Sequence, residues 1–183
     1  MRSSKAIVLL VGESGSGKTT IADYCCSTYG YKSLQSYTTR PKRFENETGH
    51  TFVAEKEFGE LKDLVAFTEY NGYLYCATSQ QVEENDIYVI DVEGIKKFLS
   101  SYKGEKKPYI IYLKASKSVR KERMKERGDS EETIAQRIKF DESAFANAED
   151  YADFICPNNY SGDIDCVADF IDSLLVYSER STE

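Results

Sequence analysis

The sequence predicts a three-layer α/β domain with a central parallel sheet, on three observations. Short apolar runs alternate with amphipathic segments along most of the chain, an order that builds a parallel sheet covered by helices. A glycine-rich loop joins the first apolar run to the first helix. Two segments interrupt the alternation: an inserted patch at 33–80 and a charged helical hairpin at 119–148. We therefore expect a single domain, 1–183, with its core formed by 1–32, 81–118 and 149–183.

Composition agrees with this prediction and excludes several classes of protein. The chain has 183 residues, of which 40% are hydrophobic and 30% are charged, enough for a folded core. The net charge of −7 argues against a general nucleic-acid binder, and no apolar run is long enough to span a membrane. The five cysteines lack zinc-binding spacing and no signal peptide is evident, so we expect a cytoplasmic protein with reduced thiols. Composition leaves the choice between monomer and homodimer open.

The core elements are predicted from the period of their apolar residues. Continuous apolar runs indicate buried strands at 5–11 and 109–113, an apolar strand at 87–91 and a short final strand at 154–156. One-sided apolar patterns indicate helices at 17–28, 94–102, 131–148 and 163–177, and a basic helix is expected at 118–127. These elements account for the three layers.

The inserted patch has a different pattern. Residues 31–39 are expected to be extended, 40–52 to form a loop and 54–65 a short helix. The dipeptide Asn71-Gly72 is a strong hairpin signal between apolar strands, and a helix follows near 80–84. The patch should therefore form a small mixed or antiparallel sheet.

The glycine-rich loop carries the most specific motif in the chain. Residues 12–19 match G-x-x-x-x-G-K-[ST] in full, between an expected strand and an expected helix. Glycines let consecutive amide groups point at one phosphate, and the helix N-terminus adds partial positive charge. Lys18 can reach the β- and γ-phosphates, and the Thr19 hydroxyl can hold Mg²⁺. The motif predicts a P-loop nucleoside triphosphate hydrolase fold and a triphosphate site made by Gly12, Glu13, Ser14, Gly15, Ser16, Gly17, Lys18, Thr19 and Thr20.

A basic loop follows within the inserted patch. Arg40, Lys42 and Arg43 fall within four positions and are preceded by hydroxyl side chains that include Ser36. Guanidinium groups bind phosphate through a planar fork of donors, so this loop is a candidate second phosphate site. An ordinary solvated charge cluster is the alternative.

The helical hairpin offers a third basic cluster. Arg123 and Arg127 are four positions apart and share a helix face, and Arg137 lies on the next helix. Surface charge paired with nearby glutamates is the alternative. Asp91, at the end of a strand, can reach either the Mg²⁺ shell or a phosphate acceptor. The three clusters suggest a site for two phosphates that an arginine hairpin closes against water.

These motifs resemble those of the guanylate kinase family, a branch of the nucleoside monophosphate kinases. Residues 36–43 and 49–52 are similar to its S-x-T-T-R-x-x-R…G-x-x-Y-x-F motif, and 123–128 are similar to its R-L-x-x-R-G motif. The resemblance implies phosphorylation of GMP or dGMP by ATP with Mg²⁺. It implies catalytic roles for Lys18, Arg123, Arg127 and Arg137, with the acceptor phosphate held by Ser36, Arg40, Arg43 and Tyr75.

The base-recognition half departs from the family pattern. Ala66 stands where the family has its guanine-reading glutamate, and Ala77 stands where a base-contacting Ser or Thr is usual. His50 lies nearest to a missing phosphate-site tyrosine, with a plain loop residue as the alternative. Asn158 and Asn159 resemble the turn near the adenine of ATP. The further candidates for acceptor binding are His50, Glu69, Thr78 and Asp91.

These departures leave other functions open. One is a kinase for another phosphorylated acceptor, such as a different nucleoside monophosphate or a ribose phosphate. Another is a non-catalytic interaction module related to guanylate kinases. Such modules typically lose the P-loop lysine and the lid arginines, whereas this chain has Lys18 and all three arginines.

Overall fold

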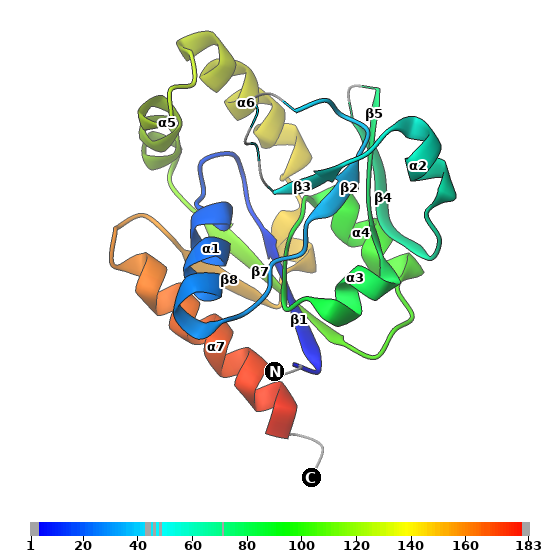
Figure 1. Ribbon diagram of the computed structural model, residues 1–183. Helices are drawn as coiled ribbons and strands as arrows, with labels where there is room; N and C mark the ends of the chain where they lie inside the picture. Colours follow the sequence, from blue (N-terminus) through cyan, green and yellow to red (C-terminus); the bar gives the residue numbers. More distant parts are fainter. Residues whose placement is uncertain (1–3, 43–44, 46, 48, 71, 181–183) are drawn as a thin grey trace.

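The computed structural model describes residues 4–42, 45, 47, 49–70 and 72–180, and a four-stranded parallel sheet lies at its centre (Figure 1). The strand order is β6-β1-β7-β8, comprising β6 (Ile87–Val89), β1 (Ala6–Val11), β7 (Lys107–Lys114) and β8 (Phe154–Pro157). All three pairings are parallel. Strand β1 lies between β6 and β7, and the glycine-rich loop follows its carboxyl end. In α/β sheets, ligands bind at the carboxyl ends of the strands.

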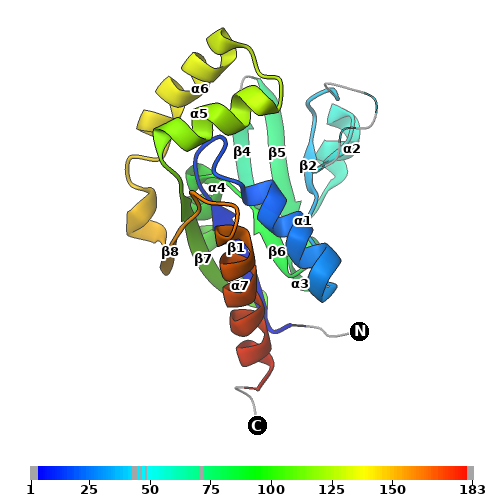
Figure 2. The ribbon, with the colours of Figure 1, turned by 90° about the vertical axis from the view of Figure 1, so that its left-hand side faces the viewer.

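Strand β1 divides the core into two halves because successive side chains point to opposite faces. Ile7 and Leu9 pack on the face covered by α4 (Val92–Ser101). Val8 and Leu10 pack on the other face, against α1 (Lys18–Tyr29) and α7 (Asp163–Arg180). Figure 2 shows α7 in front of β1 and β7, with α4 behind them. This arrangement confirms the predicted three layers.

A second sheet forms from the inserted patch. Its order is β3-β2-β5-β4, comprising β3 (His50–Phe52), β2 (Ser36–Thr38), β5 (Tyr73–Thr78) and β4 (Leu64–Tyr70). Strands β2 and β3 are parallel, whereas β5 pairs antiparallel with β2 and with β4. The hairpin prediction at β4 and β5 is confirmed, although Asn71 of its turn lies outside the described residues.

Two predictions within this patch are wrong. The loop expected at 40–52 ends early, because His50–Phe52 pair with β2 as strand β3. The helix expected at 54–65 is shorter, since α2 (Glu55–Glu60) stops where Leu61 becomes extended. Strand β3 has no apolar alternation to reveal it, because its three side chains are half-buried or exposed. Pairing between distant segments therefore decided this part of the patch.

The remaining helices flank the two sheets. Helix α3 (Ser79–Glu84) follows β5, and the short helix η1 (Ala148–Tyr151) precedes β8. Helices α5 (Lys117–Glu126) and α6 (Glu131–Ala144) form the predicted hairpin around a small core of Met124, Ile134 and Ile138. Figure 1 shows this hairpin and the second sheet on opposite sides of the loop that follows β1.

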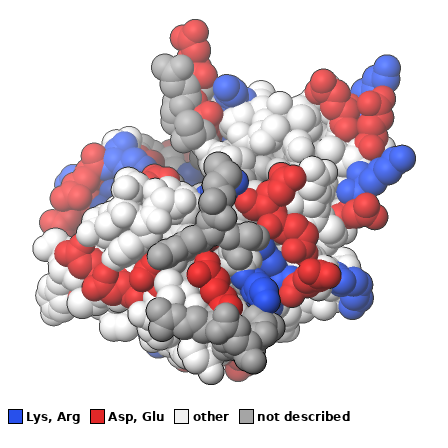
Figure 3. Space-filling model, turned by 60° about the horizontal axis from the view of Figure 1, so that its bottom comes forward, with Lys and Arg blue, Asp and Glu red and all other residues white. Residues whose placement is uncertain are grey.

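The surface agrees with the acidic composition. On the face shown in Figure 3, acidic and basic side chains are interspersed, and its described residues present no continuous basic tract. No helix among residues 4–42, 45, 47, 49–70 and 72–180 has the length and apolar character needed to cross a membrane.

Candidate functional site

The glycine-rich loop, residues 12–19, is folded tightly against its neighbours. Gly15 and Gly17 have φ values of 78° and 97°, which L-residues with side chains rarely adopt. A Cβ atom on Gly15 would lie 2.6 Å from the carbonyl oxygen of Arg120. Glycine at this position therefore lets the first turn of α5 approach the backbone of the loop.

Lys18 is held by this loop. Its Nζ atom donates to the carbonyl oxygens of Gly12 at 2.6 Å and Glu13 at 3.0 Å. Burial lowers the pKa of Lys18 to about 8, and the carboxylates of Asp141 and Glu13 partly oppose that shift. An ammonium group held by neutral carbonyls beside a cavity is available to an incoming anion.

The first cavity, which we call the loop cavity, has a volume of about 590 Å³. Of the predicted triphosphate ligands, Ser14, Gly15, Gly17, Lys18, Thr19 and Thr20 line it. Gly12 and Ser16 are buried and, with Glu13, lie outside the lining. The Glu13 carboxylate instead accepts from the Tyr112 hydroxyl at 2.9 Å.

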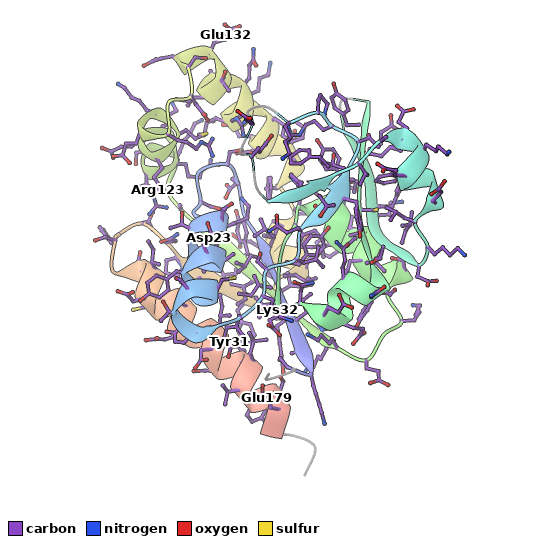
Figure 4. All side chains as sticks on the ribbon, in the orientation of Figure 1. Asp23, Tyr31, Lys32, Arg123, Glu132 and Glu179 are labelled. Carbon is purple, nitrogen blue, oxygen red and sulfur yellow. The ribbon has the colours of Figure 1, made fainter. Side chains whose placement is uncertain are left out.

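All three predicted arginines line the loop cavity. Arg123 donates from Nη1 to the carbonyl oxygen of Asn158 at 3.0 Å, and Figure 4 shows it reaching from α5 toward α1. Arg127 forms an ion pair with Asp129, and Arg137 Nε lies 3.8 Å from the same carboxylate. The buried Nε atom of Arg137 makes no hydrogen bond within the described part of the chain. The cavity therefore holds a buried donor suited to an anion, which fits a triphosphate.

The second cavity, which we call the sheet cavity, has a volume of about 680 Å³. Its lining includes Ser36, Arg40, His50 and Tyr75, which the sequence predicted together. Ser36 Oγ and His50 Nδ1 share a hydrogen bond of 2.8 Å, and the His50 and Tyr75 rings lie 5.7 Å apart. Arg43 lies outside the described residues.

Arg40 is paired within this cavity. Its guanidinium group donates to both carboxylate oxygens of Glu47, at 3.2 Å and 2.8 Å. The Glu47 hydrogen bond raises the pKa of Arg40, which is 9% exposed. Glu47 thus engages both terminal nitrogens of the Arg40 fork, and sequence reasoning did not anticipate this partner.

The rest of the sheet-cavity lining differs from the prediction. Ala66, Thr68, Tyr88 and Asp91 line the cavity, whereas Glu69 and Thr78 do not. Glu69 is exposed, on the face of β4 opposite to Thr68. Thr78 instead caps α3, with its hydroxyl accepting from the amide of Gln81 at 3.2 Å.

A backbone irregularity explains this change. Ala66 has a φ of 53°, and the pairing of β4 with β5 shifts register between Val65 and Thr68. Such a bulge inserts a residue and redirects the side chains that follow it. Thr68 therefore reaches the cavity, and counting along the sequence could not have located it.

Asp91 lines the sheet cavity and also caps a helix. Its Oδ1 atom accepts from the amide of Gly94 at 2.6 Å, at the start of α4. Desolvation of its carboxyl group by the surrounding protein raises the pKa of Asp91. One carboxylate oxygen of Asp91 is thus already engaged in capping α4.

The two cavities meet at Thr19. Among the described residues, Thr19 is the only one that lines both, and its side chain is exposed on the first turn of α1. An alcohol oxygen between two phosphate sites fits Mg²⁺, which takes few protein ligands together with phosphate oxygens. Within the described residues, His, Cys, Asp and Glu form no group of three or more that would hold a metal by itself.

Comparison with known proteins agrees with this architecture. The family model described as guanylate kinase matches residues 3–174. The guanylate kinase of Syntrophus aciditrophicus is 29% identical over 165 residues, covering 83% of this chain and 78% of the relative. That of Nitrosomonas europaea is 27% identical over 143 residues, covering 72% and 70%.

A solved structure shares the fold. The crystal structure of guanylate kinase from Anaplasma phagocytophilum matches with a TM-score of 0.61 at 20% identity, covering 97% of this chain and 87% of that one. The family match extends from before β1 into α7 and includes both cavities. The chain therefore belongs to the guanylate kinase family of nucleoside monophosphate kinases.

Proposed function

We propose that this protein transfers the γ-phosphoryl group of ATP to the phosphate of a nucleoside monophosphate, with GMP or dGMP as the leading acceptor. The observation that carries the proposal is that two cavities meet at Thr19. Lys18 and three arginines line the loop cavity, and Arg40 lines the sheet cavity. A kinase that transfers a phosphoryl group from one bound phosphorylated molecule to another needs such adjacent sites.

Each cavity has its own role in this proposal. ATP lies in the loop cavity, with its phosphates on the loop amides and Lys18. The acceptor phosphate lies in the sheet cavity, on Ser36, Arg40, His50 and Tyr75. Arg43 stays a predicted acceptor ligand. When bound, Mg²⁺ at Thr19 would neutralise phosphate charge.

The chemistry depends mainly on position and charge. The acceptor phosphate oxygen is already anionic, so no strong general base is required. Arg123, Arg127 and Arg137 supply donors for the charge on the transferring group. We propose that 119–148 acts as a lid and 33–80 as the acceptor-binding segment. A closed lid would exclude water, which otherwise competes as acceptor.

A second acceptor class is favoured by one observation. Near Ala66 the sheet cavity presents the Thr68 hydroxyl, and Glu69 lies outside it. A guanine offers N–H donors that a carboxylate reads well, whereas a hydroxyl suits several bases or a sugar. A kinase for another nucleoside monophosphate or a ribose phosphate is therefore the alternative.

An acceptor panel tests both proposals. ADP release is measured with GMP, dGMP, AMP, CMP, UMP, dTMP and a ribose phosphate, and with no acceptor as the control. Fastest turnover with GMP or dGMP supports the leading proposal, and another preferred acceptor supports the alternative. ATP binding without transfer to any of them would refute both, and a wild-type chain that does not bind ATP would indicate a non-catalytic module.

A further inference from the structure

The feature that the proposed function leaves unused is a buried charged network behind the glycine-rich loop. Asp141 on α6 is 4% exposed and Arg120 on α5 is 5% exposed. Arg120 Nη1 donates to Asp141 Oδ2 at 3.0 Å, and Arg120 Nη2 lies 3.7 Å from the Glu13 carboxylate. Neither Arg120 nor Asp141 lines either cavity.

Asp141 is bonded directly to the loop. Its Oδ2 atom accepts from the amide of Ser14 at 2.9 Å, and its Oδ1 atom accepts from the Ser14 hydroxyl at 3.3 Å. A carboxylate that accepts a main-chain amide fixes the orientation of that peptide plane. The peptide units that follow Ser14 in the loop continue from this fixed plane.

The hairpin also touches the loop through its backbone. The carbonyl oxygen of Arg120 lies so close to Gly15 that no side chain fits there. Figure 2 shows α5 and α6 lying over the loop that follows β1. Hydrogen bonds from α6 and van der Waals contact from α5 therefore act on adjacent residues, Ser14 and Gly15.

A buried ion pair by itself is weak evidence for stability, because two apolar residues can often replace it at little cost. Here the Asp141 carboxylate is shared between the ion pair and a loop amide, which an apolar pair cannot reproduce. An ordered loop binds phosphate more tightly than a loose one, since less conformational entropy is lost on binding.

We propose that Asp141, oriented by Arg120, is a positioning residue that holds the glycine-rich loop in its triphosphate-binding shape. This inference rests on the proposed function, because it assumes that the loop binds ATP. It links the α5–α6 hairpin to the donor site through Ser14. Asp141 acts through the loop and needs no contact with the nucleotide.

Calorimetric titration of the full chain with ATP and Mg²⁺, and separately with GMP, tests this inference. Asp141→Ala removes the acceptor of the Ser14 amide, so we expect the Kd for ATP to rise on the order of tenfold. The Kd for GMP should stay within about twofold. Asp141→Asn keeps an oxygen for that amide and should stay within about threefold of wild type for ATP.

Two further variants separate positioning from stability. Glu142→Gln is the matched control, because Glu142 is an exposed carboxylate on the same helix that pairs with Lys117, and it should change neither affinity. The double variant Arg120→Met/Asp141→Leu replaces the ion pair with apolar side chains. We expect a Tm close to that of wild type and an ATP affinity that is still weakened.

The outcomes are distinguishable. Unchanged or tighter ATP binding by Asp141→Ala would overturn the inference alone, as would wild-type ATP affinity in the double variant. If Asp141→Ala fails to fold, the double variant decides the question. A wild-type chain that binds no ATP would overturn the proposed function and, with it, this inference.

Discussion

The loop cavity and the sheet cavity differ in how their side chains are held. In the loop cavity, Lys18 donates to carbonyl groups of its own loop and Arg123 donates to the carbonyl group of Asn158. In the sheet cavity, Arg40 is paired with the carboxylate of Glu47, and Ser36 is bonded to His50. Backbone partners thus orient Lys18 and Arg123, although Arg127 of the same cavity pairs with Asp129. Side-chain partners orient Arg40 and Ser36.

This difference affects how readily a substitution can alter each cavity. A backbone carbonyl is present whatever the residue, so the geometry of the loop cavity depends mainly on the glycine-rich loop and the hairpin. The sheet cavity depends on particular side chains from β2, β3, β4 and β5, and a single substitution there alters what the cavity accepts. We therefore expect the lining of the sheet cavity to vary more than that of the loop cavity.

The largest expected effect is the loss of phosphoryl transfer when Lys18 of the loop cavity is replaced. Lys18→Ala removes the ammonium group of the loop, so we expect transfer to fall by about 10²–10³-fold or more. Turnover is measured at saturating acceptor, with Tm as a check on folding. Lys97→Ala, an exposed lysine on α4, is the matched control. A Lys18→Ala variant that keeps most of its turnover would refute the proposed mechanism.

The next effect should be confined to the sheet cavity. Arg40→Ala removes a fork of charged donors, and we expect the KM for the acceptor to rise on the order of 10–100-fold. The KM for ATP should change by less than about threefold. Lys42→Ala, on the same loop but exposed, serves as the control. Equal effects of Arg40→Ala on both KM values would contradict the assignment of this cavity to the acceptor.

A smaller effect tests the bulge in β4. Thr68→Val removes the hydroxyl that faces the sheet cavity, so we expect the KM for the acceptor to rise up to about tenfold. Glu69→Gln should stay within about twofold, because Glu69 points away from the cavity. Steady-state assays with the preferred acceptor measure both. The reverse order of effects would restore Glu69 as the acceptor-reading residue.

The smallest effect concerns stability beside the loop cavity. Asp163 accepts from the amides of Asn159 at 2.7 Å and Tyr160 at 2.9 Å, and these bonds lower its pKa. A lowered pKa in the folded state gives stability that is present above the unfolded pKa, about 3.8, and is lost as pH falls through the folded pKa.

We therefore expect Asp163→Asn to lower Tm at neutral pH and to lose that difference in strong acid. Thermal unfolding across pH 2–7 measures this change, with Glu60→Gln, an exposed carboxylate on α2, as the control. A constant Tm difference across the whole range would show that the charge of Asp163 does not contribute.

Local sequence predicted most of the central sheet and the loop cavity. The apolar run at β1 is fully buried, and the glycine-rich loop, Lys18 and the three arginines come together as expected. These features are readable because the apolar run and the glycine-rich motif are each contiguous in the sequence. Thr68 and Asp141 were missed, because Thr68 depends on a bulge and Asp141 on a partner distant in the chain. Glu47 was missed because no local pattern indicates that the loop brings its carboxylate to Arg40.

The sequence by itself determined the order of the layers, the position of the glycine-rich loop and the family to which the chain belongs. Periodicity and a contiguous motif carry that information, since both reflect short-range geometry. Only the tertiary structure decided which further residues line the sheet cavity, Thr68 among them, and how α6 reaches the loop. Strand register and helix packing set those contacts, and both depend on residues far apart in the chain.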